Sequence, residues 1–223
     1  MKTAKPLLAY IEIEPRNAAQ ATVIWLHGLG ASGHDFEPIV PELRLPESLA
    51  VRFIFPHAPS IPVTINNGNV MPAWYDIISM SIERELDESQ LLASSAAVVS
   101  LIERELARGI ASDKIVLAGF SQGGAVVYQA ALSYDKPLAG LMALSTYFAS
   151  ADTIKFHSAN KDLSVLIHHG SRDGVVPELL GQRAADQLQN RGYSVGYKRY
   201  SMEHSICPEQ IRDISQWLQR VLA

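Results

Sequence analysis

Gly119-Phe120-Ser121-Gln122-Gly123-Gly124 is the stretch of sequence that decides the fold. It follows an apolar run, Lys114–Ala118, that is typical of a strand, and it precedes the helical pattern Ala125–Ala130. G-x-S-x-G between a strand and a helix predicts a serine on a sharp, strained turn, because a side chain at either flanking glycine would collide with neighbouring backbone. The helix directs its first amides and its positive dipole end at the point where an oxyanion would form. Ser121 is therefore the predicted nucleophile; the alternative is a glycine-rich turn that only holds a surface serine.

On either side of this stretch, short β-branched runs alternate with longer segments of helical period. The predicted strands are Leu7–Ile13, Thr22–Leu26, Val51–Phe55, Lys114–Ala118, Gly140–Leu144, Ser164–His168 and Val195–Tyr200. The predicted helices are Glu88–Ala107, the segment after Ser121, Pro177–Asn190 and Pro208–Leu222. This alternation predicts an α/β fold with a mostly parallel central sheet and helices on both faces, in one domain spanning residues 1–223. The segment Pro56–Met80 is long, irregular and rich in Pro and Asn, so we expect a functional loop there.

Composition and charge restrict the classes of function. The chain has 223 residues, 48% of them hydrophobic and 19% charged, which indicates a globular protein with a substantial core. Its net charge of −4 gives no electrostatic reason to expect nucleic acid or an anionic membrane as a partner. Cys207 is the single cysteine, and the apolar run at Leu7–Ile11 is too short for a signal peptide or a membrane span. We therefore expect a cytoplasmic protein without stable membrane insertion.

A second glycine-rich loop follows the strand Thr22–Leu26. It reads His27-Gly28-Leu29-Gly30-Ala31-Ser32-Gly33, and its glycines allow the backbone to approach a ligand closely. An oxyanion hole in this kind of fold takes one amide from such a loop and one from the residue after the nucleophile, here Leu29 and Gln122. The alternative is a phosphate-binding loop, since Gly28–Gly33 formally matches G-x-G-x-x-G. The chain lacks the strand–helix–strand continuation ending in an acid that this reading requires.

The remaining catalytic partners should follow Ser121 in the order acid, then histidine. Among the later histidines, His204 lies between the last strand and the last helix, where its imidazole can reach the serine, whereas the positions of His168 and His169 suit packing or backbone capping. Asp173 stands in the loop right after the strand ending at His168, at a strand's carboxyl end. The other acids weighed are Asp152 and Asp162, before that strand, and Glu178 and Asp186, in the next helix.

Together these motifs resemble the phospholipase/carboxylesterase family of α/β-hydrolases, which includes the acyl-protein thioesterases. The resemblance is carried by His27–Gly30, Phe55–Pro59, Pro62–Thr64, Met71–Asp76, Gly119–Gly124, His169–Asp173 and Met202–Ser205. It implies Ser121, Asp173 and His204 as the catalytic triad, with oxyanion donors at Leu29 and Gln122. The chain departs from the family pattern at Ala31, where many members carry an aspartate, and at Gln90, where a glycine is common. Because some bacterial relatives form dimers, the resemblance leaves a homodimer open.

The substrate contacts are the least defined part of this prediction. Met71, Trp74 and Val176 are the predicted substrate-binding residues, together with the neighbouring Leu29 and Val175, although packing into the core is the more common role for Trp. No metal is expected, since the histidines lack H-x-x-x-H or H-E-x-x-H spacing.

We therefore expect a serine carboxylesterase that cleaves short- to medium-chain esters through an acyl-enzyme and needs no cofactor. The ligand would be a small-molecule ester or acyl thioester. An acyl-protein thioesterase or a lysophospholipase is the alternative. A non-catalytic binding module is the alternative from a different class, but such a module normally carries a broken triad.

Overall fold

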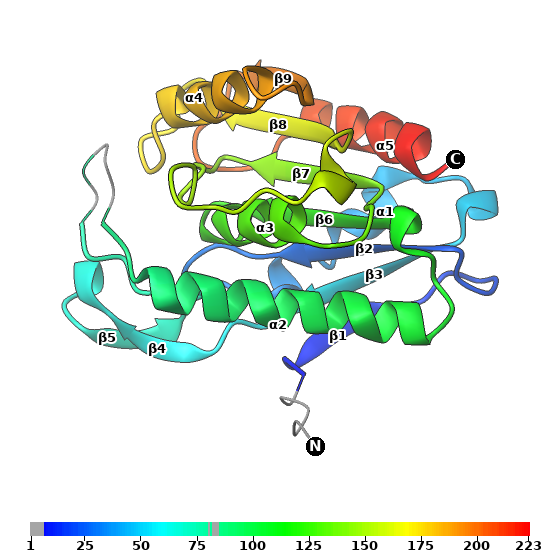
Figure 1. Ribbon diagram of the computed structural model, residues 1–223, viewed down its shortest axis with the longest axis horizontal. Helices are drawn as coiled ribbons and strands as arrows, with labels where there is room; N and C mark the ends of the chain where they lie inside the picture. Colours follow the sequence, from blue (N-terminus) through cyan, green and yellow to red (C-terminus); the bar gives the residue numbers. More distant parts are fainter. Residues whose placement is uncertain (1–6, 80, 82–84) are drawn as a thin grey trace.

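The computed structural model describes residues 7–79, 81 and 85–223. Within these residues a seven-stranded sheet has the order β1-β3-β2-β6-β7-β8-β9 (Figure 1). Its strands are β1 (Tyr10–Ile13), β2 (Ala21–Leu26), β3 (Val51–Pro56), β6 (Ile115–Phe120), β7 (Gly140–Leu144), β8 (Ser164–Gly170) and β9 (Ser194–Tyr200). Only β1 pairs antiparallel, with β3, and the other neighbours in this sheet are parallel. The mostly parallel sheet predicted from the sequence is confirmed.

The strands are apolar almost throughout because the sheet is covered on both faces. In β2, every residue is buried, and alternate side chains enter two separate cores. Val23 and Trp25 face one core, whereas Ile24 and Leu26 face the other. Each strand of this kind therefore contributes to two hydrophobic layers at once.

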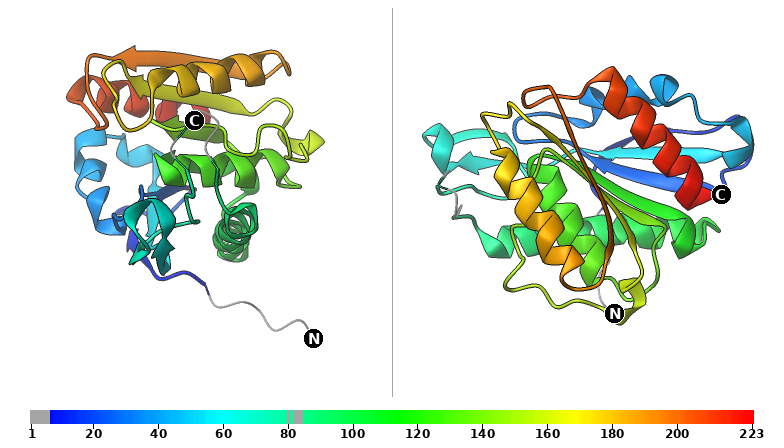
Figure 2. Two further views of the ribbon diagram at one scale, coloured as in Figure 1. Left: turned by 90° about the vertical axis from the view of Figure 1, so that its left-hand side faces the viewer. Right: turned by 90° about the horizontal axis from the view of Figure 1, so that it is seen from above.

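Helices cover the two faces of the sheet separately. α2 (Glu88–Ala107), α3 (Gln122–Ser133) and α4 (Glu178–Gln189) lie on one face, while α1 (Ile39–Leu43) and α5 (Pro208–Leu222) lie on the other, as the right-hand view of Figure 2 shows. The bounds of α2 and α5 are those predicted. Asp87 caps α2 by accepting a hydrogen bond from the amide of Gln90 (3.0 Å), and Pro208 occupies the first turn of α5.

The segment Pro56–Met80, predicted to be an irregular loop, contains a hairpin; Met80 itself lies outside the described residues. β4 (Ser60–Val63) pairs antiparallel with β5 (Asn69–Pro72). The prolines that made this segment look irregular are tolerated because a two-stranded hairpin has only edge strands. Asp76 closes the hairpin by accepting hydrogen bonds from the amide (2.7 Å) and hydroxyl (2.6 Å) of Thr64.

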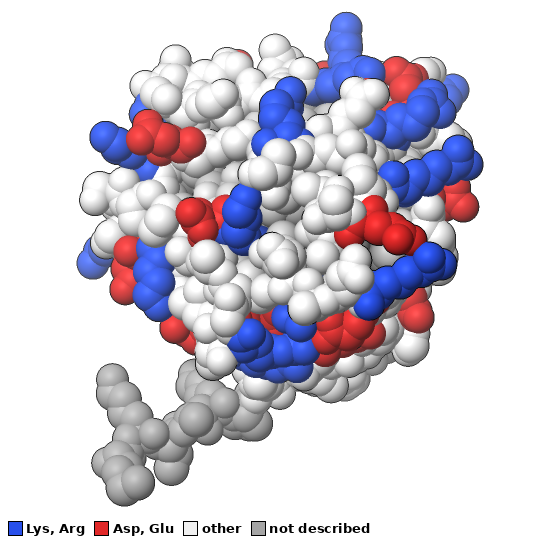
Figure 3. All heavy atoms as spheres, turned by 90° about the vertical axis from the view of Figure 1, so that its right-hand side faces the viewer, with Lys and Arg blue, Asp and Glu red and all other residues white. Residues whose placement is uncertain are grey.

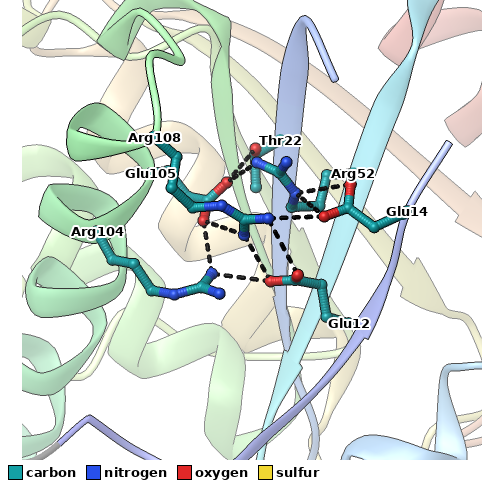
Figure 4. A network of polar contacts seen from close by, with 7 residues as sticks. All are labelled: Glu12, Glu14, Thr22, Arg52, Arg104, Glu105 and Arg108. Carbon is teal, nitrogen blue, oxygen red and sulfur yellow. Dashed lines mark hydrogen bonds and ion pairs between the residues drawn. The ribbon is translucent and has the colours of Figure 1, made fainter. Parts of the chain in front are cut away.

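A charged network ties the edge strand β1 to the body of the protein (Figure 4). Its centre is Glu105 of α2, whose side chain is 0% exposed. One carboxylate oxygen of Glu105 accepts hydrogen bonds from Thr22 (2.9 Å) and Arg52 (2.6 Å). The other accepts from Arg104 (2.7 Å) and Arg108 (3.1 Å). These arginines also bind Glu12 and Glu14 on and beside β1, so that α2, β1, β2 and β3 share one set of ion pairs.

The surface carries both signs of charge. On the face shown in Figure 3, lysine and arginine side chains alternate with aspartates and glutamates and form no continuous field of one sign. Within the described part of the chain, none of the helices is long and apolar enough to cross a membrane.

Candidate active site

Ser121 lies between β6 and α3, at the end of the sheet where the arrows of β7 and β8 point in Figure 1. Its backbone has φ 53° and ψ −121°, a left-handed conformation that costs a non-glycine residue about 1–3 kcal/mol. Two hydrogen bonds hold this conformation. The Ser121 amide donates to the Leu144 carbonyl (2.9 Å), and the Thr146 hydroxyl donates to the Ser121 carbonyl (2.6 Å).

The flanking glycines are required by close backbone contacts. A Cβ at Gly123 would lie 2.5 Å from the His27 carbonyl oxygen and 2.7 Å from the Leu26 Cβ. A Cβ at Gly119 would lie 2.6 Å from the amide nitrogen of Gly124. Such separations are far inside van der Waals contact, so the collision expected from the sequence is present at both positions.

The loop after β2 lies directly against the serine. A Cβ at Gly28 would be 3.3 Å from the Cβ of Ser121. The buried ring of His27 fixes this loop, since its Nδ1–H donates to the Gly28 carbonyl (2.7 Å) while its Nε2 accepts from the Ala58 amide (3.1 Å). Burial lowers the pKa of His27, which keeps the ring neutral. Because a trans peptide directs its N–H opposite its C=O, the amide of Leu29 points away from this ring.

The side chain of Gln122 holds a second segment beside the serine. It accepts a hydrogen bond from the Trp74 amide (2.9 Å) and donates one to the Tyr75 carbonyl (2.7 Å). Its own backbone amide is at the first position of α3, where the helix itself offers no carbonyl to accept it. The geometry therefore leaves this amide available beside Ser121.

Asp173 and His204 come together from the loops after β8 and β9. The Nδ1–H of His204 donates to Oδ2 of Asp173 at 2.7 Å. Oδ1 of Asp173 accepts from the amides of Val175 (2.9 Å) and Val176 (2.8 Å). Burial alone would raise the pKa of Asp173, but these hydrogen bonds outweigh it and hold the pKa below its ordinary value. The carboxylate is thus kept charged and oriented toward the imidazole.

A cavity of about 630 Å³ joins the serine and the histidine. The ring of His204 packs on Phe120 (4.7 Å between centroids), and Phe120 in turn packs on Phe36 (5.7 Å). The wall is mostly apolar and comes from the loop after β2, from α1 and from the start of α5. It comprises Gly28, Leu29, Ala31, Asp35, Phe36, Pro38, Ile39, Glu42, Phe120, Ser121, Val175, His204, Ser205, Ile206 and Ile211.

The predicted substrate-binding residues Met71, Trp74 and Val176 are not among the residues that line this cavity. Trp74 and Val176 are only 1% and 2% exposed, so their side chains belong to the core and do not line this cavity. Trp74 is held there by the hydrogen bond from its indole N–H to the His27 carbonyl (2.8 Å). Met71 is half-buried in β5, with its sulfur against Asn66 (3.1 Å), and is not part of the lining either. Of the neighbouring candidates, Leu29 and the 48% exposed Val175 do line it.

Asp152, Asp162 and His157, which the sequence also offered, do not line this cavity. Asp152 and Asp162 are exposed, and the exposed His157 accepts a hydrogen bond from the Ala159 amide (3.2 Å). In residues 7–79, 81 and 85–223, no group of three or more His, Cys, Asp or Glu side chains could hold a metal ion.

Comparison with known proteins places these features in context. A model of the phospholipase/carboxylesterase family matches residues 9–222. An acyl-protein thioesterase 1 of Neurospora crassa is 40% identical over 209 residues, covering 89% of this chain and 85% of that protein. An acyl-protein thioesterase 1 of Cryptococcus neoformans is 38% identical over 236 residues, covering 96% and 98%.

Solved structures of similar proteins superpose on nearly the whole chain. SOBER1 of Arabidopsis thaliana superposes with a TM-score of 0.85 at 33% identity, over 92% of this chain and 100% of that one. The acyl-protein thioesterase 2 of Zea mays gives a TM-score of 0.84 at 28% identity, over 96% and 99%.

Proposed function

The chain belongs to the phospholipase/carboxylesterase family of α/β-hydrolases and is a carboxylic ester hydrolase. From this we propose that it cleaves short- to medium-chain carboxylic esters. Its catalytic triad would be Ser121, His204 and Asp173. One observation carries the proposal. His204, which is 2.7 Å from the buried carboxylate of Asp173, lines the same apolar cavity as a serine held in a left-handed conformation. A base that is oriented by a third group and lies in the same cavity as a serine supports activation of that serine as a nucleophile.

The reaction would proceed by covalent acyl transfer. His204 takes the proton of Ser121 as the hydroxyl attacks the ester carbonyl, and Asp173 stabilises the imidazolium that forms. The amides of Leu29 and Gln122 receive the oxyanion. His204 then gives its proton to the leaving alcohol, and a water activated by the same ring releases the acid and restores the serine.

The proposal extends to the domain organisation, the cellular location and the ligand of the protein. We propose that residues 1–223 act as one domain in the cytoplasm, on a small ester or acyl thioester and without a cofactor or nucleic acid. The mostly apolar cavity supports a small uncharged acyl group as the ligand. A homodimer, which the resemblance leaves open, is tested by measuring the mass of the protein in solution.

An acyl-protein thioesterase is the second candidate function. It is favoured by the Neurospora crassa and Cryptococcus neoformans relatives, which carry that name at 40% and 38% identity. The chemistry is the same, because a thioester carbonyl is attacked by the same serine and its thiolate leaves more easily than an alkoxide. The two candidates differ only in the group that the cavity must accept on the far side of the carbonyl.

The two candidates are separated by matched substrates. We would measure kcat/KM for p-nitrophenyl esters and for alkyl thioesters that carry the same acyl chain. The ratio of the two kcat/KM values is then compared over a series of acyl lengths. Each added methylene should gain at most about 0.8 kcal/mol until the cavity is full. The rate should not jump when an ester exceeds its solubility limit; activity on emulsified triglycerides alone would refute the proposal.

The nucleophile is tested by substitution. Ser121→Ala should lose essentially all activity on both substrates and all labelling by a fluorophosphonate. Ser150→Ala is the matched control, since the Ser150 hydroxyl is buried but hydrogen-bonds nothing in the described part of the chain. Loss of labelling in the control and not in Ser121→Ala would remove Ser121 from the mechanism.

A further inference from the structure

A second histidine lies behind the acid of the proposed triad. His169, in β8, is 0% exposed and sits on the side of Asp173 away from solvent. Its Nε2 is 2.8 Å from the carbonyl oxygen of Val176 and 3.5 Å from Oδ2 of Asp173. His204 and His169 therefore both approach the same carboxylate oxygen, but only His204 faces the cavity.

The contacts of His169 fix its proton. A carbonyl can only accept, so Nε2 carries the hydrogen and donates it to Val176. Nδ1 is then an unprotonated acceptor, and this buried atom has no hydrogen-bond partner among the described residues. Burial lowers the pKa of His169, although the charges of Asp173 and Glu178 act in the opposite direction. The charge of Glu178 is itself paired with Arg199 of β9 at 3.6 Å. The ring is thus a neutral donor with one defined tautomer.

Helix α4 is shaped to accept this ring. A Cβ at Gly181 would overlap Nδ1 of His169 and lie 3.1 Å from its Cε1. A glycine inside a helix costs roughly 1 kcal/mol relative to alanine. Helix α4 therefore carries a glycine at the position where the imidazole of His169 packs against it.

We propose that His169 is a positioning residue that holds the Asp173 carboxylate in line with His204. His169 binds the carbonyl of Val176, the last residue of the segment 173–176, and the amides of Val175 and Val176 in that segment donate to Oδ1 of Asp173 at 2.9 and 2.8 Å. With Oδ1 held in this way, Oδ2 is directed at Nδ1 of His204. The inference rests on the proposed function, because it deepens the role of Asp173 in the same site.

The test compares variants that keep or remove the donor. The amide nitrogen of His169→Gln can occupy the place of Nε2, whereas His169→Phe fills the pocket without a donor. His169→Asn carries an amide that is too short to reach Val176, and it replaces His169→Phe should that variant not fold. The readouts are kcat and KM on a soluble p-nitrophenyl ester, the pH profile of kcat/KM, and Tm.

Loss of the donor should lower kcat by roughly 10- to 100-fold with KM changed by less than about 3-fold, as expected when an interaction used in the transition state is removed. The acid limb of the profile should move to lower pH, because a less well placed carboxylate stabilises the imidazolium less. His169→Gln should recover most of kcat and the wild-type profile.

Two outcomes would overturn the positioning role. One is wild-type kcat in His169→Phe or His169→Asn. The other is a loss of kcat that is equal in His169→Gln and His169→Phe, parallels the fall in Tm and leaves the pH profile unchanged. That result would mean that His169 contributes only to packing. Failure of the proposed function is distinguishable, since it appears as activity retained in Ser121→Ala whatever the His169 variants do.

Discussion

Replacing the central carboxylate of the charged network tests how the edge of the sheet is held. In Glu105→Gln, one side of the new amide can still accept from Thr22 and Arg52 or from Arg104 and Arg108, but its NH₂ must then face the other pair of donors. The side chain is 0% exposed, so water cannot relieve that mismatch.

The size of the effect follows from what is left unpaired. Arg52 is 7% exposed and keeps only Glu14 as an anionic partner. Removing one partner of a buried ion pair typically costs about 3–5 kcal/mol, because the remaining charge is buried without compensation. For a domain of this length we expect Tm to fall by about 6–20 °C.

The assay is urea unfolding with matched Tm measurements, and Glu47→Gln is the control. Glu47 also binds an arginine, Arg16 at 2.8 Å, but the two side chains are 68% and 84% exposed. An exposed pair of this kind contributes about 0–1 kcal/mol. The ester hydrolysis rate of the folded Glu105→Gln protein should stay near wild type, since the network lies at the amino end of β2 and the serine lies beyond the carboxyl end of β6. A loss of stability no larger than that of Glu47→Gln would refute the reasoning.

Two further predictions concern the elbow and the response to acid. Gly123→Ala should fold, but its free energy of unfolding should be lower by about 1–3 kcal/mol and it should lose most of its activity. The reason is that the added Cβ would press on the His27 carbonyl and displace the glycine-rich loop after β2. Urea unfolding measures the first effect and kcat the second, and a fully active variant would contradict the contact. For Glu12, burial raises the pKa, but hydrogen bonds from Arg108 and Arg104 outweigh it and lower the pKa to about 2 from 4.5. This depressed pKa contributes stability that is present above pH 4.5 and is lost as the pH falls toward about 2. The stability difference between wild type and Glu12→Gln should therefore shrink across that interval, and a difference that grew on acidification would reverse the assignment.

The local pattern of the chain was sufficient to predict the strands of the central sheet and the helices α2 to α5, but not α1 or the hairpin β4–β5. The bounds of α2 and α5 and the central strands follow from apolar periodicity, because a strand buried on both faces and a helix with one apolar stripe differ in period. The positions of Ser121, Asp173 and His204 follow from the same information. Parallel strands bring the loops after their carboxyl ends to one edge of the sheet, so order along the chain is enough to bring these three side chains together as candidates.

The lining of the cavity depends on tertiary packing. Phe36 and Ile39 meet Ile206 and Ile211 because α1 and α5 cover the same face of the sheet, and no local signal relates segments so far apart in the sequence. Packing into the core was the more common role expected of a Trp, and the burial of Trp74 and its hydrogen bond to the His27 carbonyl place it there.

The role of His169 has the same origin. The sequence shows a histidine at the end of a strand, where packing or capping was the expected use. Only the fold packs its ring against Gly181, in the space that a Cβ would otherwise fill, and brings Nε2 within 2.8 Å of the Val176 carbonyl oxygen. Periodicity and motif spacing report which face of an element is buried, but a side chain's partner is chosen by contacts between elements, and those exist only once the chain has folded.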